Sequence, residues 1–361
     1  MNKLKKIGLT ALAGSLVAVS ATAGEMSVSG SLGATYSTQN GTTGTEATDN
    51  AKGIGSDKDF TVSGSGELDN GWTFSGYTLT KDDLTVSSSA LSMTMGSLGT
   101  ISTGTGFGGN STAYDVQTPT AWEEVDDGGA SSLSANFVGS WADDGSLVYA
   151  SPAYAVGEMS VTAHVEYAPK AAGTAIADGG AASSVTYGSG QSLGITVEGQ
   201  GVKFGVYGAE RENVTQQVAG TDAVKDAFSG VAFVNYTNGP ISVGYSQSYY
   251  DSGLLVATET ATAKKVVGVA GGIFESETMS VAYAVNENLS VSIAKASDTY
   301  DAQDNATTAT ADVDMDMKSV QVAYSMGAMS IKAYRTKTDN TGYSTDNGSL
   351  TITEIALGLS F

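Results

Sequence analysis

The last residues of the chain form an alternating segment that ends on an aromatic residue. Ile355, Leu357, Leu359 and Phe361 are apolar, and small or polar residues separate them. A period of two gives a strand one apolar face and one polar face. A chain that stops on such a strand suits a closed membrane barrel, in which the final strand pairs with the first. A C-terminal strand of a soluble sandwich is the alternative that this segment alone leaves open.

The other end of the chain predicts export. A lysine-rich flank precedes a short apolar run, which is followed by the small residues Ala21 and Ala23. This order is typical of a secretory signal peptide, so we expect cleavage after Ala23, with 24–361 as a single domain. Beyond residue 23 no stretch approaches the roughly 18 continuous apolar residues of a spanning helix. An exported chain of this kind either stays free or crosses a membrane as a β-barrel.

Composition narrows the possible classes of protein. The chain has only 4 Pro in 361 residues, as expected for long paired strands, and no Cys, which excludes a disulfide framework and a cysteine zinc site. Acidic residues outnumber basic ones by 38 to 17, giving a formal net charge of −21. This charge disfavours nucleic acid and anionic lipid as partners, and an acidic lumen would concentrate cations. Solubility is the alternative reason for the acidity.

Alternating segments and turn signals predict about sixteen strands. Tight turns rich in Gly, Asn and Asp alternate along the chain with long polar connections, a rhythm typical of an outer-membrane barrel rather than a sandwich. The fold class predicted is all-β, a transmembrane antiparallel up-and-down β-barrel. The expected strands are 25–36, 59–68, 72–80, 84–95, 99–105, 145–154, 157–167, 191–199, 202–211, 228–237, 241–250, 276–285, 289–297, 316–326, 329–338 and 350–361.

The alternation also assigns the two faces of the wall. On 157–167, Val165 and its apolar neighbours two residues apart face lipid, whereas His164 and Glu166 face the lumen. Lys203 faces the lumen from the strand 202–211. Because the lumen side is polar, we expect the barrel to hold water, with these three residues lining the pore.

Three local motifs resemble the general diffusion porins of Gram-negative bacteria. The segment 146–154, which reads SLVYASPAY, is similar to the stretch that opens the strand after the long third loop of that family. Upstream, 99–104 resembles the Gly-x-x-x-x-Gly strand that enters this loop, and Phe361 matches the family's C-terminal aromatic residue. Strand number, loop rhythm and both termini extend the resemblance over the whole chain.

The resemblance implies a function and a site. It implies a sixteen-stranded homotrimeric porin in the outer membrane that passes small hydrophilic solutes and ions, without enzyme activity or cofactor. The implied partners are outer-membrane lipid, lipopolysaccharide and the barrel-assembly machinery, which reads Phe361. Residues 106–144 are implied to fold inward as a constriction loop. Its acidic residues, here called the loop acids, are Asp115, Glu123, Glu124, Asp126 and Asp127.

The expected sign of selectivity comes from a departure from the family pattern. Family constrictions often oppose the loop acids with arginines on the wall, but the first five predicted strands contain no Arg. We therefore expect a mostly negative constriction and a preference for cations.

Two other chemistries are compatible with particular residues of the chain. His164, the only histidine, shares a face with Glu166 and could be half of a hydrolytic site, although no serine can be placed beside it. Asp312, Asp314 and Asp316 alternate, so they share one strand face. They could bind Ca²⁺ or Mg²⁺, but an acidic stripe on the pore rim is the preferred interpretation, and no metal site is predicted.

Two other functions stay open at this stage. A substrate-selective channel of the same architecture would be favoured by aromatic residues at the constriction, for which the candidates are Phe107, Tyr114, Trp122, Phe137 and Trp141. A secreted β-rich adhesin or surface protein would be favoured by repeats of fixed period, which the sequence lacks.

Overall fold

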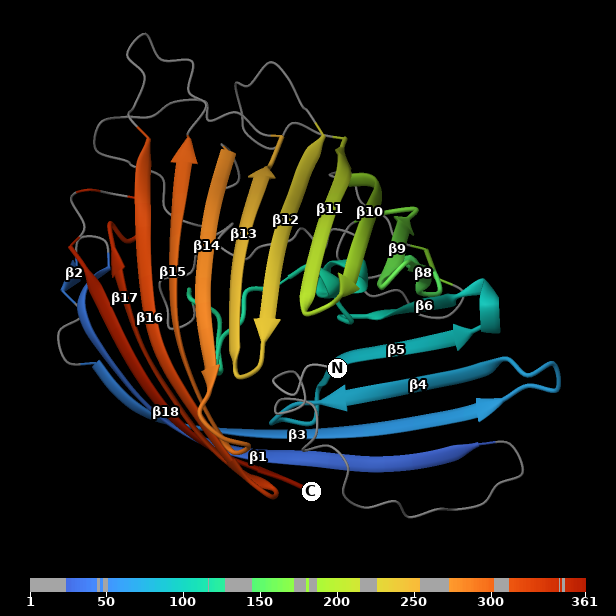
Figure 1. Cartoon of the computed structure of the whole chain (residues 1–361), viewed down its shortest axis with the longest axis horizontal. Coiled ribbons are helices and arrows are strands. Elements are labelled where there is room, and N and C mark those ends of the chain that lie inside the picture. Colours follow the sequence, from blue (N-terminus) through green and yellow to red (C-terminus); the bar gives the residue numbers. More distant parts are fainter. Residues whose placement is uncertain are drawn as a thin grey trace, which may run out of the picture.

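The computed structural model is an antiparallel β-barrel (Figure 1). Within the described part of the chain, sixteen strands form its wall, as the sequence predicted. The structure describes residues 24–43, 46–47, 51–115, 117–126, 145–171, 180–181, 187–214, 226–253, 273–301, 312–343, 345 and 348–361. The predicted signal peptide, 1–23, lies outside these residues.

The first half of the wall contains both the longest and the shortest strands. One wall strand is split in two, because β7 and β8 both pair with β9 and the residues between them include Pro152, which has no N–H to give to the ladder. The short β2 pairs only with the end of β1. The bounds are β1 Glu25–Thr43, β2 Glu46–Ala47, β3 Ala51–Glu67, β4 Thr73–Thr80, β5 Val86–Thr94, β6 Thr100–Thr105, β7 Leu147–Ala150, β8 Tyr154–Val156 and β9 Met159–Ala168.

The second half consists of strands of 11 to 14 residues, joined by tight turns at one end. The bounds are β10 Tyr187–Gly199, β11 Val202–Asn213, β12 Ala227–Asn238, β13 Ile241–Asp251, β14 Ile273–Ala284, β15 Leu289–Asp301, β16 Val313–Met326, β17 Met329–Asp339 and β18 Leu350–Ser360. Two short 3₁₀ helices, Gly96–Leu98 (η2) and Gly109–Ala113 (η3), are the helices of the described residues, and neither is long and apolar enough to cross a membrane.

The barrel closes between its first and last strands. β1 pairs with β18 from Ser31↔Ser360 to Gly41↔Leu350, and on its other side it pairs with β3. The pairing reaches the last residue, since Phe361 N–H donates to Gly30 O (3.0 Å) and Gly30 N–H donates to Phe361 O (2.9 Å). Closure satisfies the backbone groups that an open edge would leave unpaired.

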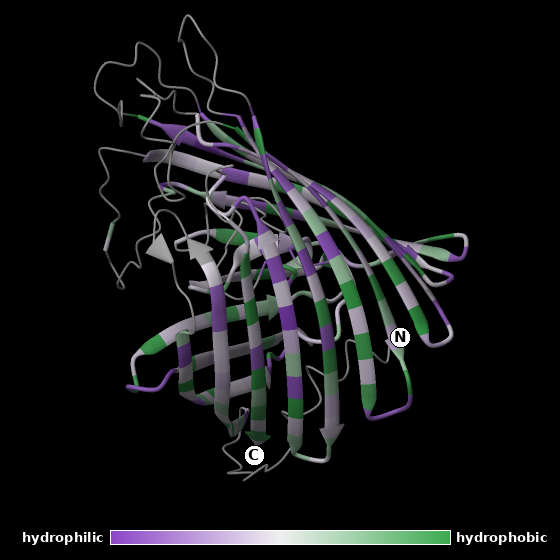
Figure 2. Ribbon diagram, turned by 90° about the vertical axis from the view of Figure 1, so that its left-hand side faces the viewer, coloured by the Kyte–Doolittle hydropathy of each residue, from purple (hydrophilic) through white to green (hydrophobic). Residues whose placement is uncertain are grey.

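The predicted assignment of faces is confirmed. On β9 the outward side chains of Val165 and Tyr167 are 45% and 52% exposed, whereas Glu166 between them is 1% exposed. Figure 2 shows hydrophobic and hydrophilic residues alternating along the strands in the same way. The outer face is therefore largely apolar near the tight turns, and the inner face carries polar and buried residues.

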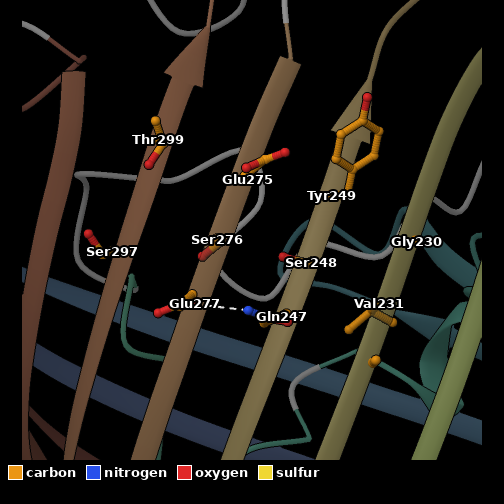
Figure 3. Close-up of a pocket in the computed structure, with 11 residues that line it drawn as sticks. Gly230, Val231, Gln247, Ser248, Tyr249, Glu275, Ser276, Glu277, Ser297 and Thr299 are labelled. Atoms are coloured by element: carbon orange, nitrogen blue, oxygen red, sulfur yellow. Dashed lines mark hydrogen bonds between the residues drawn. The ribbon is translucent and has the colours of Figure 1, made fainter. Parts of the chain in front are cut away.

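The outer face becomes polar toward the long connections. On β14 the outward series Tyr283, Val281, Met279 continues as Glu277 and Glu275. These two glutamates line a depression on the outside of β12–β15 (Figure 3), where Gln247 Nε2 donates to Glu277 Oε1 (2.9 Å). The strands thus continue beyond the apolar band of the wall.

One predicted connection is part of the wall instead. A long loop was expected at 37–58, between the first two predicted strands, but β1 and β3 remain paired as far as Gln39↔Ala51. These extensions are rich in Gly, Ser, Thr and Lys and have no apolar alternation, because they lie beyond the apolar band. Hydrogen bonding alone defines them as strands, and an amphipathic pattern does not reveal them.

Candidate functional site

The inner face of the barrel is the candidate site. The chain that follows β6, residues 106–115 and 117–126, contacts this face and is here called the segment. Gly106, Gly108 and Gly109 all have positive φ (58°, 77° and 56°), which lets the chain turn directly after β6. At Gly109 a side chain has no room, since a Cβ there would lie 2.3 Å from Glu166 Oε1.

The first anchor of the segment is the buried carboxylate of Glu166 on β9. Its Oε2 accepts from Asn110 N–H (3.3 Å) and Ser192 Oγ (3.2 Å), and its Oε1 accepts from Ser146 Oγ (2.8 Å). Two wall strands and both ends of the long connection therefore meet at one side chain. Because a buried carboxylate needs such donors, its role here is to hold the segment rather than to meet solute.

The second anchor is Tyr114, whose side chain is 1% exposed. Its hydroxyl lies 2.7 Å from His164 Nδ1, and its ring stacks on Tyr207 with a centroid distance of 4.8 Å. The ring fits because Gly194 faces it without a side chain; a Cβ there would lie 2.2 Å from Tyr114 Cζ. Burial raises the pKa of the Tyr114 hydroxyl, which keeps this group neutral.

The middle of the segment is bound to β11 and β12. Lys203 Nζ donates to Gln117 Oε1 (2.7 Å), and Asn235 Nδ2 donates to the carbonyl oxygen of Gln117. Lys203 also lies 3.4 Å from Glu198 of β10. This lysine is inward, as predicted, and it is shared between the wall and the segment.

The far end of the segment reaches β15 and β16. Ala121 N–H donates to Ser292 Oγ (2.8 Å), and the N–H groups of Trp122 and Glu123 both donate to Gln321 Oε1 (2.9 and 3.0 Å). Gln321 Nε2 returns a hydrogen bond to Glu123 O (2.7 Å). Gln321 was not singled out from the sequence, where it is one of many inward polar residues.

Three acidic residues of the segment lie near this far end. Glu123, Glu124 and Asp126, here called the far acids, are half-buried, and Asp115 is half-buried nearer to β9. Asp127, the fifth loop acid, lies outside the described residues. Positive charge is also close: Lys332 Nζ of β17 lies 5.7 Å from the centre of the Trp122 ring. The far acids are thus accompanied by a wall cation that the first five strands do not supply.

Solved structures share this architecture. OmpF of Salmonella typhi, in complex with daunomycin, covers 94% of this chain and 98% of its own, with a TM-score of 0.65 and 14% identity. An anion-selective porin from Comamonas acidovorans covers 94% and 100%, with a TM-score of 0.64 and 13% identity. OmpT of Vibrio cholerae in its trimer form covers 94% and 100%, with a TM-score of 0.54 and 15% identity.

The chain has the fold of the outer-membrane porins. No protein-family model and no curated protein matches its sequence. At these identities the likeness shows the porin fold alone, and one of the three structures is named anion-selective, so the fold does not decide the sign of selectivity.

The structure also shows where the aromatic residues considered for a substrate-selective constriction lie. Tyr114 is fully buried as an anchor, and Trp122 packs against Tyr334 with a centroid distance of 5.3 Å. Phe107 is half-buried, and Phe137 and Trp141 lie outside the described residues. These positions show no aromatic row along the described part of the segment.

His164 and Glu166, considered above as half of a hydrolytic site, bind different partners. His164 is bound to Tyr114, whereas the two serines near Glu166 donate to its carboxylate. In the described part of the wall no hydrogen bond joins His164 to a serine. Both residues face inward, as predicted, and both hold the segment.

The acidic triplet Asp312, Asp314 and Asp316, here called the outer acids, was expected on the pore rim, and this placement is wrong. Asp314 and Asp316 share the outer face of β16 with Val320 and Val322, because Met315 and Met317 point inward. Burial, followed by the charges of Asp301 and Asp314, raises the pKa of the Asp312 carboxyl. Among the described residues, no group of three metal-binding side chains converges here or elsewhere.

Proposed function

We propose that this protein is an outer-membrane porin, a water-filled channel for passive diffusion of small hydrophilic solutes and ions. The observation that carries the proposal is a closed sixteen-stranded wall with apolar residues outside, together with a segment bound to its polar inner face. Segment 106–126 meets β9 at one end and β16 at the other, so it crosses the lumen and narrows it. Residues 106–126 of the expected constriction loop, 106–144, then lie inside the barrel, and 127–144 are outside the described residues.

The apolar outer face of the barrel supports the proposed location in the outer membrane. Exposed residues such as Ile293 (58%), Val320 (62%) and Leu193 (58%) form an apolar surface that water does not favour and lipid does. The predicted signal peptide delivers the chain across the inner membrane, and the outer membrane is where closed barrels of this kind are found. This surface disfavours the alternative of a secreted adhesin.

The channel prefers cations in this proposal. The far acids and Asp115 lie in the segment that narrows the lumen, and charges close to a constriction act with little screening. Lys203 is bound to Glu198 and Gln117, and Lys332 is a single charge. These lysines therefore reduce the cation preference without cancelling it. The net negative charge of the chain acts in the same direction.

The test is reconstitution of the folded protein into a planar bilayer under a KCl gradient. A reversal potential whose sign shows cation selectivity supports the proposal. A sign that shows anion selectivity refutes the proposed cation preference. Absence of conductance from correctly folded protein refutes the channel itself. Saturable block by one sugar or organic cation, with no block by others, would instead favour a substrate-selective channel.

The partners proposed are those that the resemblance implies. The chain assembles as a homotrimer, is inserted by the barrel-assembly machinery and is surrounded by outer-membrane lipid and lipopolysaccharide. Cross-linking of membranes that contain the protein tests the first of these. A ladder that stops at three copies is expected, and a ladder that stops at one or two copies contradicts the homotrimer.

A further inference from the structure

Three lysines lie in direct register on the outside of neighbouring strands. Lys295 of β15 is opposite Lys318 of β16, and Lys318 is opposite Lys337 of β17. All three side chains are exposed on the outer face, and we call them the lysine row. Adjacent strands are about 4.8 Å apart, so the Cα atoms of the three lysines span a width of about 10 Å.

Such a row is unfavourable for the fold by itself. Like charges directly opposite each other across strands destabilise a sheet. Partial compensation comes from Asp316, 3.9 Å from Lys295, and from Asp339, 2.8 Å from Lys337. Within the described residues, Lys318 in the centre has no ion-pair partner, and neither does Arg335 beside the row. A local arrangement that opposes folding suggests a function.

The surroundings of the row indicate the kind of ligand. Directly below it, toward the tight turns, lie the exposed apolar side chains Ile293, Val320 and Val322. The acidic side chains Asp316 and Asp339 lie above it, toward the long connections. The row therefore marks the boundary between the apolar band and the polar end of the wall, where lipid headgroups lie.

We propose that the lysine row binds the phosphorylated headgroup of an outer-leaflet lipid, whose acyl chains lie on the apolar residues below. The inference rests on the outer-membrane location proposed above. The acidity of the whole chain disfavours anionic lipid in general, but the attraction of a headgroup depends on the charges within about 8–10 Å of it. On β14–β17 these charges are the lysine row and Arg335, which outnumber the acidic residues Asp316, Asp339 and Glu277 by four to three.

The experiment measures lipid binding by the folded protein in detergent micelles, using native mass spectrometry. The probes are bis-phosphorylated lipid A, the same lipid without its phosphates, and inorganic phosphate as a competitor. The variant is Lys295→Gln/Lys318→Gln/Lys337→Gln. The control is Lys52→Gln/Lys58→Gln/Lys81→Gln, which changes the net charge equally at exposed lysines near β1–β5. Heat-modifiable migration on gels verifies that each variant is folded.

The row variant is expected to bind bis-phosphorylated lipid A at least about tenfold more weakly than the native protein, since each lysine near a membrane surface contributes appreciably. The control variant and the lipid without phosphates should show no such difference. Equal loss in both variants overturns the proposal. Displacement of the lipid by inorganic phosphate at the same concentration overturns it as well, because the site would then bind any phosphate. Conductance of the row variant shows separately whether the channel proposal holds.

Discussion

Adding a single methyl group at Gly194 should detach the segment from the wall. Gly194 faces the ring of Tyr114, and a Cβ at this position would lie 2.2 Å from Cζ and 2.3 Å from the hydroxyl oxygen. Carbon atoms in contact are about 3.5–4.0 Å apart, so in Gly194→Ala the ring must retreat by more than about 1 Å. The hydrogen bond between the Tyr114 hydroxyl and His164 Nδ1, now 2.7 Å, would then exceed its useful length.

The magnitude follows from the contacts that are lost. A net hydrogen bond contributes about 0.5–1.5 kcal/mol, and an aromatic pair contributes about the same beyond its buried area. Loss of the bond to His164 and of the stacking on Tyr207 therefore weakens this anchor by about 1–3 kcal/mol. That change multiplies the ratio of detached to attached segment by roughly 5 to 150. The barrel itself should keep its stability, because the wall hydrogen bonds are unaffected.

Single-channel recording in planar bilayers provides the assay. Gly194→Ala should show more frequent conductance fluctuations than the native channel. Gly208→Ala on the outer face of β11 is the matched control, since a Cβ there meets the nearest atom, of the Phe228 ring, at an ordinary 3.5 Å. In a Tyr114→Ala background the extra methyl should have no further effect, because the clash is gone. Equal behaviour of the two alanine variants, or an undiminished effect without the tyrosine ring, would refute the reasoning.

Three other outcomes are expected. Replacing the far acids by Asn or Gln should lower the cation-to-anion permeability ratio roughly twofold or more. The same change of the outer acids should leave the ratio unaltered, since salt screens charges beyond about 8–10 Å. Equal shifts of the reversal potential would mean that the segment does not narrow the pore. Gln321→Leu removes the acceptor of the half-buried Trp122 and Glu123 N–H groups, at a cost of up to about 1–3 kcal/mol, and should increase conductance noise. Gln247→Leu on the outer wall should not, and similar noise in both variants would contradict the role of Gln321 as an anchor. Deletion of Phe361 removes two hydrogen bonds of the closing strand and the contact of its ring with Phe60 (6.1 Å between centroids), so the amount of heat-modifiable barrel in outer-membrane fractions should fall several-fold; a normal amount would show that this residue is dispensable for assembly.

The two faces of each wall strand could be predicted from the sequence wherever the strand has lipid on one side and water on the other. On β9 and β11, side chains two residues apart have the same environment, so Val165, Glu166 and Lys203 could each be assigned to a face in advance. The number of strands followed from the same alternation together with the turn residues. The rule fails where a strand leaves the apolar band. The ends of β1 and β3 are polar on both faces, and the ladder Gln39↔Ala51 is not visible as a pattern.

The site depended on information that alternation does not contain. The sequence identified 106–144 as unusual only through a family resemblance, and it gave no reason to connect Trp122 with Gln321, which is 199 residues away. Likewise, Asp314 and Asp316 could be assigned to one common face, but which face that was depended on Met315 and Met317 packing against Val125 of the segment.

The amino-acid sequence by itself therefore determined a closed amphipathic wall, because the period of two is a local property of each strand. Only the tertiary structure decided which residues meet across the barrel and in which register. Register aligns Lys295, Lys318 and Lys337, and closure brings the segment after β6 to the inner face of β16. Both depend on how distant strands are paired, so neither is encoded in any one stretch of sequence.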